Sequence, residues 1–251
     1  MKRLLLLTLA LSGFSLQAAE VRYYDVEVII FENLQANSRH AEQWPENMQR
    51  EIPESLIEIG GAWPGGIPEN YDPALSFTPL PTDKWRLSAE AEKIEKSKSR
   101  RVLAHLAWVQ PGLPQEQAIS VHFNRMISAN DAAMESGAEQ SETDHEQNAD
   151  EDRNDSGVLD ALIRVSLARY LRVEADLLFT LDQNPIPSEA SMPPSETDMT
   201  DEPETTPAAP GYYHMQQVRR RIRSTELHYL DHPVLGMLIM FTPHETAEKK
   251  K

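Results

Sequence analysis

The sequence GVLDALIRVSLARYLRVEADLLFTL, residues 157–181, alternates apolar and polar side chains along nearly its whole length. At a period of two residues the apolar side chains share one face, interrupted only by Arg169, as in a strand with one buried face. A period of 3.6 residues also aligns several leucines, so an amphipathic helix is the alternative. The strand pattern accounts for more positions. Because the stretch is long for one strand, it predicts two consecutive strands with a bend near Ser166 to Tyr170.

Other segments place this pair of strands in a larger sheet. Strand patterns recur in residues 24–31, 101–110, 118–123, 215–226 and 234–241. Residues 88–97 are rich in helix formers, and Ser88 is in position to cap the helix N-terminus. Residues 34–80 are rich in Pro, Gly and Asn, which predicts a long irregular connection with short helical turns. The predicted fold class is α+β, a mainly antiparallel β-sheet with one or more packed helices.

The formal net charge is −16, and two segments account for all of it. Residues 128–157 contain ten acidic residues against Arg153, a net −9, and residues 182–210 contain seven acidic and no basic residues, a net −7. Both have few large apolar residues, so burial cannot offset the entropy of ordering them, and mobile acidic insertions are predicted. Acidic docking segments for a partner are the alternative.

A single domain is predicted over residues 20–243, with a disordered tail at residues 244–251.

Residues 1–19 have the order of a secretory signal peptide. Two basic residues precede an apolar stretch over residues 4–16, and Ala18 or Ala19 offers the cleavage site. The stretch is shorter than the ~20 residues that a spanning helix needs, and an uncleaved anchor is the alternative. The absence of cysteine excludes disulfides and a lipoprotein anchor at this site. Periplasmic localisation is predicted, without a transmembrane segment after cleavage and without nucleic acid as a partner, since no basic face with aromatic residues is visible.

The stretch HYLDHPVLGMLIMF, residues 228–241, contains two histidines at a spacing that would bind zinc on a helix. Pro233 disfavours a helical conformation at His232, and Tyr229 stands where a metalloprotease would need glutamate. The alternative is a turn formed by Asp231, His232 and Pro233, in which the Asp231 carboxylate bonds backbone amides. No cysteine nucleophile and no GxSxG motif is present. The sequence therefore predicts no catalytic site, no metal site and no cofactor.

Two groups of residues are candidates for ligand contacts. In a regular strand Arg219, Arg221 and Arg223 would share one face, which fits an acidic ligand such as the carboxylates of cell-wall peptides. A charged outer face that blocks edge-to-edge pairing of sheets is the alternative. Trp63 and Trp85 stand in loop-like contexts, where their rings could stack on sugar rings.

Four stretches of the chain resemble, in the same order, the CsiV family of gammaproteobacterial periplasmic proteins. They are YYDVEVIIFE at residues 23–32, RVLAHLAWVQPG at residues 101–112, VSLARYLRVEADLLF at residues 165–179 and RRRIRSTELHYLDHPVLGMLI at residues 219–239. The two acidic segments fall between them. The family pattern includes Arg169, Tyr170 and Leu171 as an RYL element and Asp231, His232 and Pro233 as a DHP element, both interpreted as structural.

The resemblance implies a non-catalytic protein that binds peptidoglycan and supports cell shape, cell division and envelope integrity. It further implies as partners a bifunctional, class A penicillin-binding protein and the outer-membrane lipoprotein that activates it. Two other functions stay open at this point. One is a protein-interaction factor of the envelope that does not bind the wall directly, and the other is a cryptic envelope hydrolase.

Overall fold

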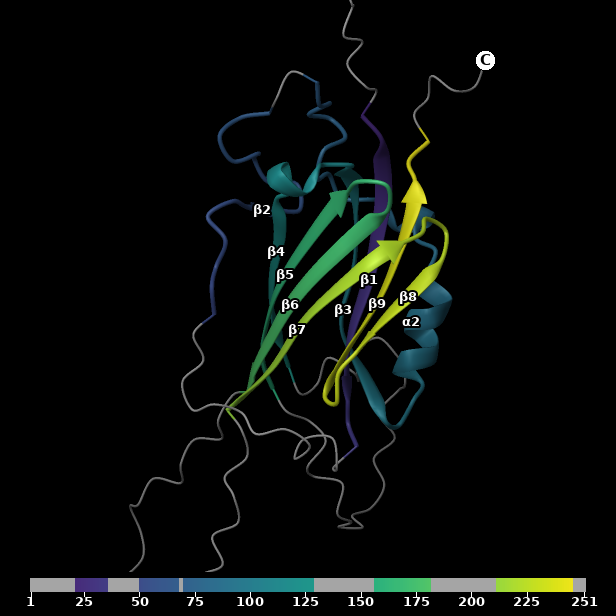
Figure 1. Cartoon of the computed structure of the whole chain (residues 1–251). Coiled ribbons are helices and arrows are strands. Elements are labelled where there is room, and N and C mark those ends of the chain that lie inside the picture. Colours follow the sequence, from purple (N-terminus) through teal and green to yellow (C-terminus); the bar gives the residue numbers. More distant parts are fainter. Residues whose placement is uncertain (1–20, 36–49, 68–69, 129–155, 182–210, 246–251) are drawn as a thin grey trace, which may run out of the picture.

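Two β-sheets packed face to face form the body of the protein (Figure 1). The computed structural model describes residues 21–35, 50–67, 70–128, 156–181 and 211–245. The strands are β1 (Tyr23–Asn33), β2 (Leu56–Glu58), β3 (Arg100–Pro111), β4 (Ser120–Ile127), β5 (Gly157–Leu167), β6 (Leu171–Leu181), β7 (Tyr212–Ile222), β8 (Leu227–Asp231) and β9 (Leu235–Pro243). The helical segments are α2 (Ser88–Glu95) and the 3-10 turns η1 (Thr82–Lys84) and η2 (Gln115–Gln117).

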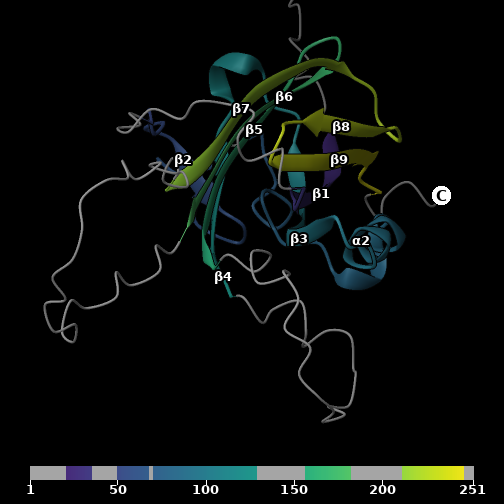
Figure 2. The same ribbon diagram turned by 90° about the horizontal axis from the view of Figure 1, so that it is seen from below.

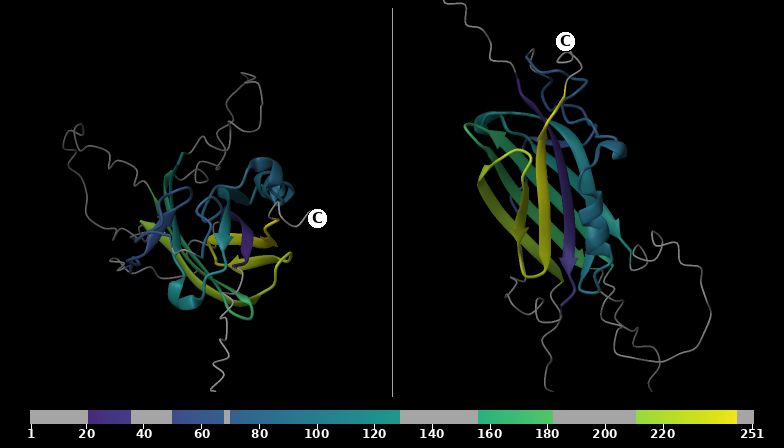
Figure 3. Two further views of the ribbon diagram at one scale, coloured as in Figure 1. Left: turned by 90° about the horizontal axis from the view of Figure 1, so that it is seen from above. Right: turned by 90° about the vertical axis from the view of Figure 1, so that its right-hand side faces the viewer.

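The smaller sheet has the strand order β3-β1-β9-β8 and the larger one the order β2-β4-β5-β6-β7. All pairs are antiparallel except the short parallel pair of β2 with β4. Seen along the sandwich, the larger sheet curves around the smaller one, and α2 lies against the outer side of the smaller sheet (Figure 2). The strands of the two sheets cross at an angle (Figure 3). The predicted mainly antiparallel α+β fold with a packed helix is confirmed.

The main hydrophobic core lies between the sheets, and a second, smaller core lies under α2. β1 contributes to both because its side chains alternate. Val26, Val28 and Ile30 face the larger sheet, whereas Ile29 and Phe31 pack with Leu87, Ile94 and their neighbours beneath the helix. The end of β1 is therefore apolar on both faces, since each face is covered by another layer.

Residues 157–181 form the hairpin of β5 and β6, which confirms the two strands with a bend and excludes the helix. The pairing runs from Gly157↔Leu181 to Leu167↔Leu171, so the bend occupies residues 168–170. The apolar row at odd positions faces the smaller sheet, with Leu159, Ile163, Leu177 and Phe179 at 1% exposure or less and with Leu167 and Leu181 partly buried at the ends of the strands. Alternation determines the structure here because burying one row of side chains leaves the other in solvent.

At the other end of this hairpin, four strand termini of the larger sheet lie side by side. Ile127 pairs with Gly157, Gly157 pairs with Leu181, and Thr180 pairs with Tyr212. The predicted acidic insertions lie between these termini, almost wholly outside the described residues. The predicted signal peptide also lies outside them. No helix within the described ranges combines the length and the apolarity needed to cross a membrane.

Three details differ from the sequence predictions. The predicted strand at residues 215–226 ends at Ile222, and a separate strand, β8, follows and pairs with β9. Ser88 is the first residue of α2 and not its cap; the N-cap position is Leu87, which makes no side-chain capping bond. His244, predicted to begin a disordered tail, donates its backbone N–H to the Tyr23 carbonyl at 2.9 Å and pairs through its ring with Asp25.

Candidate functional site

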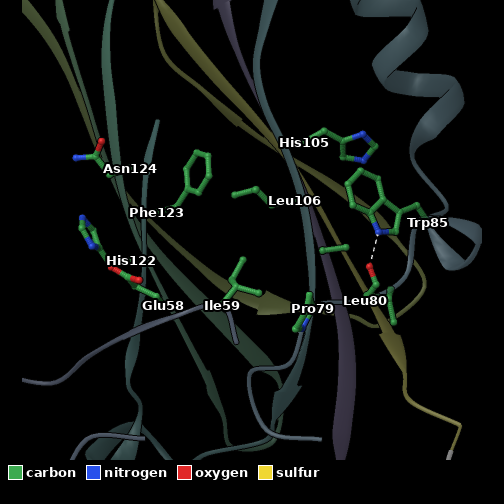
Figure 4. Close-up of a pocket in the computed structure, with 11 residues that line it drawn as sticks. Glu58, Ile59, Pro79, Leu80, Trp85, His105, Leu106, His122, Phe123 and Asn124 are labelled. Atoms are coloured by element: carbon green, nitrogen blue, oxygen red, sulfur yellow. Dashed lines mark hydrogen bonds between the residues drawn. The ribbon is translucent and has the colours of Figure 1, made fainter. Parts of the chain in front are cut away.

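An open groove lies where the edges of the two sheets face each other, beside β3 on one side and β2 and β4 on the other. Its volume is about 410 Å³, within the range of about 300–1,000 Å³ that small-ligand sites occupy. Its lining includes Glu58, Trp85, His105, His122, Phe123 and Asn124. Figure 4 shows Leu106 of β3 and Phe123 of β4 directed toward each other between the polar and aromatic residues.

The groove exists because the free edge of β3 is covered only in part. The segment at residues 77–80 pairs with its C-terminal half, where Phe77 N–H donates to Val109 O at 2.7 Å and Leu80 N–H to Ala107 O at 2.9 Å. Farther along, the Arg125 guanidinium donates to the Leu103 carbonyl at 3.3 Å. The stretch between these two contacts, around His105, faces the groove. The backbone groups of alternate residues of a strand point to the same edge, so His105 presents its N–H and C=O there.

Trp85, a predicted ligand contact, borders this groove on the side of α2. Its indole N–H donates to the Leu80 carbonyl at 2.9 Å, and its ring centroid lies 4.3 Å from that of His105. The ring is therefore held in place while its side chain stays half-exposed. The location is compatible with stacking on a ligand, and that role stays a prediction.

Glu27 fixes the position of both His105 and the start of α2. Its carboxylate lies 2.8 Å from His105 Nε2 and accepts the backbone N–H of Arg86 at 2.6 Å and of Leu87 at 2.9 Å. Burial raises the pKa of Glu27, but the hydrogen bonds from His105 and from the two amides outweigh it, so the pKa lies below its ordinary value. Glu27 is therefore an ionised, buried anchor for the groove wall.

Glu27→Gln is expected to lower the free energy of unfolding at pH 7 by about 1–3 kcal/mol, because buried donors lose a charged acceptor. A carboxyl group with a depressed folded-state pKa stabilises the fold above its unfolded pKa, and this contribution disappears as the pH falls through the folded-state pKa. The penalty should therefore shrink below about pH 4. Urea unfolding at pH 7 and at about pH 3 measures it, with the exposed Glu58→Gln as control. A penalty independent of pH would contradict the ionised state of Glu27.

A second polar cluster covers the outer face of the larger sheet and was not predicted. The Arg50 guanidinium lies 2.6 Å from the Asp160 carboxylate and 2.8 Å from that of Asp176. His122 approaches Asp160 at 3.4 Å, and His214 approaches Asp176 at 3.0 Å. Burial raises the pKa of Asp176, but the hydrogen bond from His214 and the positive charge of Arg50 bring it below its ordinary value.

This cluster is structural in its geometry, since it attaches Arg50 to the outer face of β5 and β6. Among the described residues no group of three or more His, Asp or Glu side chains could hold a metal ion. The signal that could have indicated it is the polar row of β5 to β7, which contains Asp160, Asp176 and His214. Arg50 comes from a segment without periodicity, so its partners could not be predicted.

The three predicted arginines lie away from the groove, at the far end of β7. The pairing skips from Val173↔Arg219 to Leu171↔Ile222, so residues 220 and 221 together oppose Arg172 in a β-bulge. The prediction that Arg219, Arg221 and Arg223 share one face of a regular strand is therefore wrong in its geometry. All three side chains are exposed, and their role as ligand contacts stays a prediction.

Trp63 is half-buried and packs against Tyr71 and Phe77, with ring centroids 5.4 Å and 5.1 Å away. Its ring is thus engaged in packing at the edge of the main core, and the groove does not include it. Its predicted contact with a ligand has no support from this position. The loop-like sequence context, which it shares with Trp85, did not distinguish the two.

The DHP element forms the predicted turn, between β8 and β9, by a different contact. His232 Nδ1 accepts the backbone N–H of Val234 at 3.3 Å and of Leu235 at 3.1 Å, whereas the Asp231 carboxylate accepts the Tyr229 hydroxyl. The prediction that Asp231 bonds the turn amides is therefore wrong, and His232 takes that role.

The RYL element occupies the β5–β6 bend. Arg169 lies over the half-exposed Tyr170 ring, with its guanidinium carbon 5.5 Å from the ring centroid, and Leu171 is buried. Both motif elements therefore form tight connections between strands.

Comparison with known proteins adds the family. A family model described as peptidoglycan-binding protein, CsiV, matches residues 3–244, which is nearly the whole chain. No curated protein and no solved structure matches. The match covers both sheets, the groove and all four stretches on which the resemblance rested. The chain belongs to the CsiV family of peptidoglycan-binding proteins.

Proposed function

We propose that this protein is a non-catalytic, periplasmic peptidoglycan-binding protein and that the groove holds the glycan strand of the wall. The observation that carries the proposal is an open groove of amphipathic lining in a chain of this family. Sugar rings have apolar faces that stack on aromatic rings and a rim of hydroxyl groups that need polar partners. Trp85 offers the aromatic ring, and Glu58, His122 and Asn124 offer the polar groups.

The free edge of β3 supports an N-acetylated sugar in particular. His105 presents one backbone donor and one acceptor to the groove, on the same edge at which Ala107 and Val109 bond residues 77–80. An acetamido group carries the same pair of groups as a peptide bond, so it can continue this backbone pairing for one more step. The sugars of peptidoglycan are N-acetylated and therefore carry this group.

The composition of the groove supports binding without hydrolysis. Glycoside hydrolysis uses two carboxyl groups on opposite sides of the scissile bond. Among the described residues that line the groove, Glu58 is the one carboxylate. It lies in the short strand β2, exposed to solvent. A groove with this lining favours holding a glycan over cleaving it, and a release of soluble muropeptides from purified walls would contradict this part of the proposal.

The cellular role follows from the family resemblance and from the predicted signal peptide. In this proposal the protein supports cell-wall synthesis, cell division and cell shape by assisting a class A penicillin-binding protein through its outer-membrane lipoprotein activator. A protein-interaction factor without direct wall binding is the second candidate, and the exposed arginines at the end of β7 favour it. The two candidates differ in whether the purified protein alone binds purified walls.

Sedimentation with purified sacculi tests the proposal. Trp85→Ala is expected to weaken binding roughly 30-fold, since an aromatic anchor in a binding site contributes about 2 kcal/mol. Tyr170→Ala removes a half-exposed aromatic side chain outside the groove and should bind like the native protein. Asn124→Ala, an exposed groove residue, is a second variant with little risk to folding.

Two outcomes would contradict the proposal at different levels. A native protein that stays in the supernatant at low and at high salt would exclude direct wall binding and favour the protein-interaction factor. If Trp85→Ala and Asn124→Ala both bind sacculi with the affinity of the native protein, the wall-binding site lies elsewhere on the chain. Near-ultraviolet circular dichroism of each variant shows that a loss of binding is not a loss of fold.

A further inference from the structure

The end of β7 and the β5–β6 bend lie side by side, and both carry exposed arginines. The pair Leu171↔Ile222 brings the bend beside the last residues of β7. We define the arginine surface by the exposed side chains that gather there. They are Arg169, Tyr170, Arg219, Arg220, Arg221 and Arg223.

A bulge in β7 lies within this surface. Arg219 precedes it and pairs with Val173, and residues 220 and 221 together oppose Arg172. Arg221 has a left-handed backbone, with φ 61°, which non-glycine residues rarely adopt. Arg219, Arg220 and Arg221 are all exposed, and Ile222 returns to the core at 1% exposure. Strained backbone of this kind concentrates at functional sites.

The arginines of this surface have few carboxylate partners. Elsewhere in the chain Arg50, Arg101 and Arg164 each face a carboxylate, at 2.6 Å, 2.7 Å and 3.6 Å respectively. Within the described part of the chain, Arg219, Arg220 and Arg221 have no ion pair, and Arg223 has only an exposed contact with Glu226 at 3.6 Å. A chain of net charge −16 thus keeps a concentrated, unpaired positive surface.

The composition of this surface fits a protein partner. Guanidinium groups bind carboxylates through two parallel hydrogen bonds, and arginine and tyrosine are enriched at protein interfaces. Tyr170 and Val218, the residue of β7 before Arg219, add exposed apolar area, at 39% and 51% exposure. Arginines spread over a strand end and a bend require several successive carboxylates, which an acidic polypeptide supplies. We propose that the arginine surface binds an acidic segment of a partner protein.

The position of the surface leaves the groove free. The groove lies at β4 and the arginine surface at β7, three strand spacings or about 14 Å across the sheet. The two sites also lie at different heights, since Asn124 pairs with Asp160 in the middle of β5 whereas Arg219 pairs with Val173 near the bend. One molecule can therefore hold the wall and an acidic partner at the same time.

Fluorescence anisotropy with a labelled decaglutamate peptide tests the proposal on the purified protein. The native protein should bind the peptide at low salt, and Arg219→Gln/Arg220→Gln/Arg221→Gln should weaken binding at least tenfold. The corresponding triple lysine variant keeps the charge but loses the guanidinium fork, so its affinity should fall between the two. Lys93→Gln/Lys96→Gln/Lys98→Gln on and after α2 changes the net charge by the same amount and should leave binding within twofold.

Several outcomes would overturn the proposal. One is that the triple arginine variant binds decaglutamate as tightly as the native protein, and another is that the triple lysine-to-glutamine control loses as much affinity. A third is that the triple arginine variant loses binding to phosphatidylglycerol vesicles while it keeps binding to decaglutamate. The last result would assign the surface to a membrane. Arg221→Gly fits the left-handed backbone and should keep the bulge, so weaker binding by this variant with an unchanged near-ultraviolet circular dichroism spectrum reports the loss of the guanidinium group. Sacculus binding should be unchanged in the triple arginine variant and decaglutamate binding unchanged in Trp85→Ala, which separates this proposal from the wall-binding one.

Discussion

Arg101→Leu is expected to lower the free energy of unfolding by about 3–5 kcal/mol, because it removes the guanidinium group from a buried carboxylate. Arg101 and Glu32 are cross-strand neighbours in β3 and β1, 2.7 Å apart, and their side chains are 6% and 0% exposed. The guanidinium carbon also lies 6.0 Å from the ring centroid of Phe179 in the opposite sheet. The pair therefore lies inside the sandwich, where water cannot replace a lost partner.

Urea unfolding at pH 7 measures this effect, and two variants serve as controls. Arg100→Leu makes the same change one residue earlier at an exposed position and should cost less than about 1 kcal/mol. Glu32→Leu/Arg101→Leu replaces both charges by apolar side chains and should recover most of the loss. If Arg101→Leu costs no more than Arg100→Leu, the pair is accessible to water and the packing between the sheets is looser than described.

Phe77→Ala is expected to cost about 3–5 kcal/mol, because it removes a fully buried ring and leaves a cavity. The loss extends beyond the ring, since Trp63 packs edge-on against it. Phe77 also begins the segment that covers part of the β3 edge, so its removal should loosen one end of the groove and weaken sacculus binding as well.

Thermal unfolding and tryptophan emission together measure the effect of Phe77→Ala. The midpoint should fall, and the emission should shift to longer wavelength as Trp63 gains contact with water. Phe77→Leu retains most of the apolar volume and should lose no more than half as much stability. A midpoint unchanged by Phe77→Ala would mean that residues 77–80 are not docked on β3.

The parts of the fold that could be predicted are those with a long, regular pattern. Residues 157–181 fit the strand period at more positions than the helix period, and the odd-numbered apolar row matches the main core between the sheets. β8 was missed because it has five residues and follows a bulge and a turn, so too few positions alternate. The bulge itself has no glycine to indicate it, since Arg221 adopts the left-handed conformation.

The groove could not be predicted, because it forms where several parts of the chain meet. β2, β3, β4 and the loop with Trp85 become neighbours only once both sheets are in place. Trp85 borders the groove, and its contact with a ligand stays a prediction, but the same reasoning selected Trp63, whose ring packs against Tyr71 and Phe77. Arg101 looked like an ordinary strand residue for the same reason, since its burial depends on Phe179 in the opposite sheet.

The four strand termini that lie side by side at one end of the larger sheet make the chain modular. Ile127 and Gly157 are already paired, as are Thr180 and Tyr212, so a short hairpin could join each pair without shifting any register. Chain closure is insensitive to such changes, since a doubling of loop length costs only about 0.6 kcal/mol. Because the two connections carry −9 and −7, the other residues of the 251-residue chain together have zero net charge. The two acidic connections could therefore be lengthened, shortened or removed while the pairing of the strands stays the same.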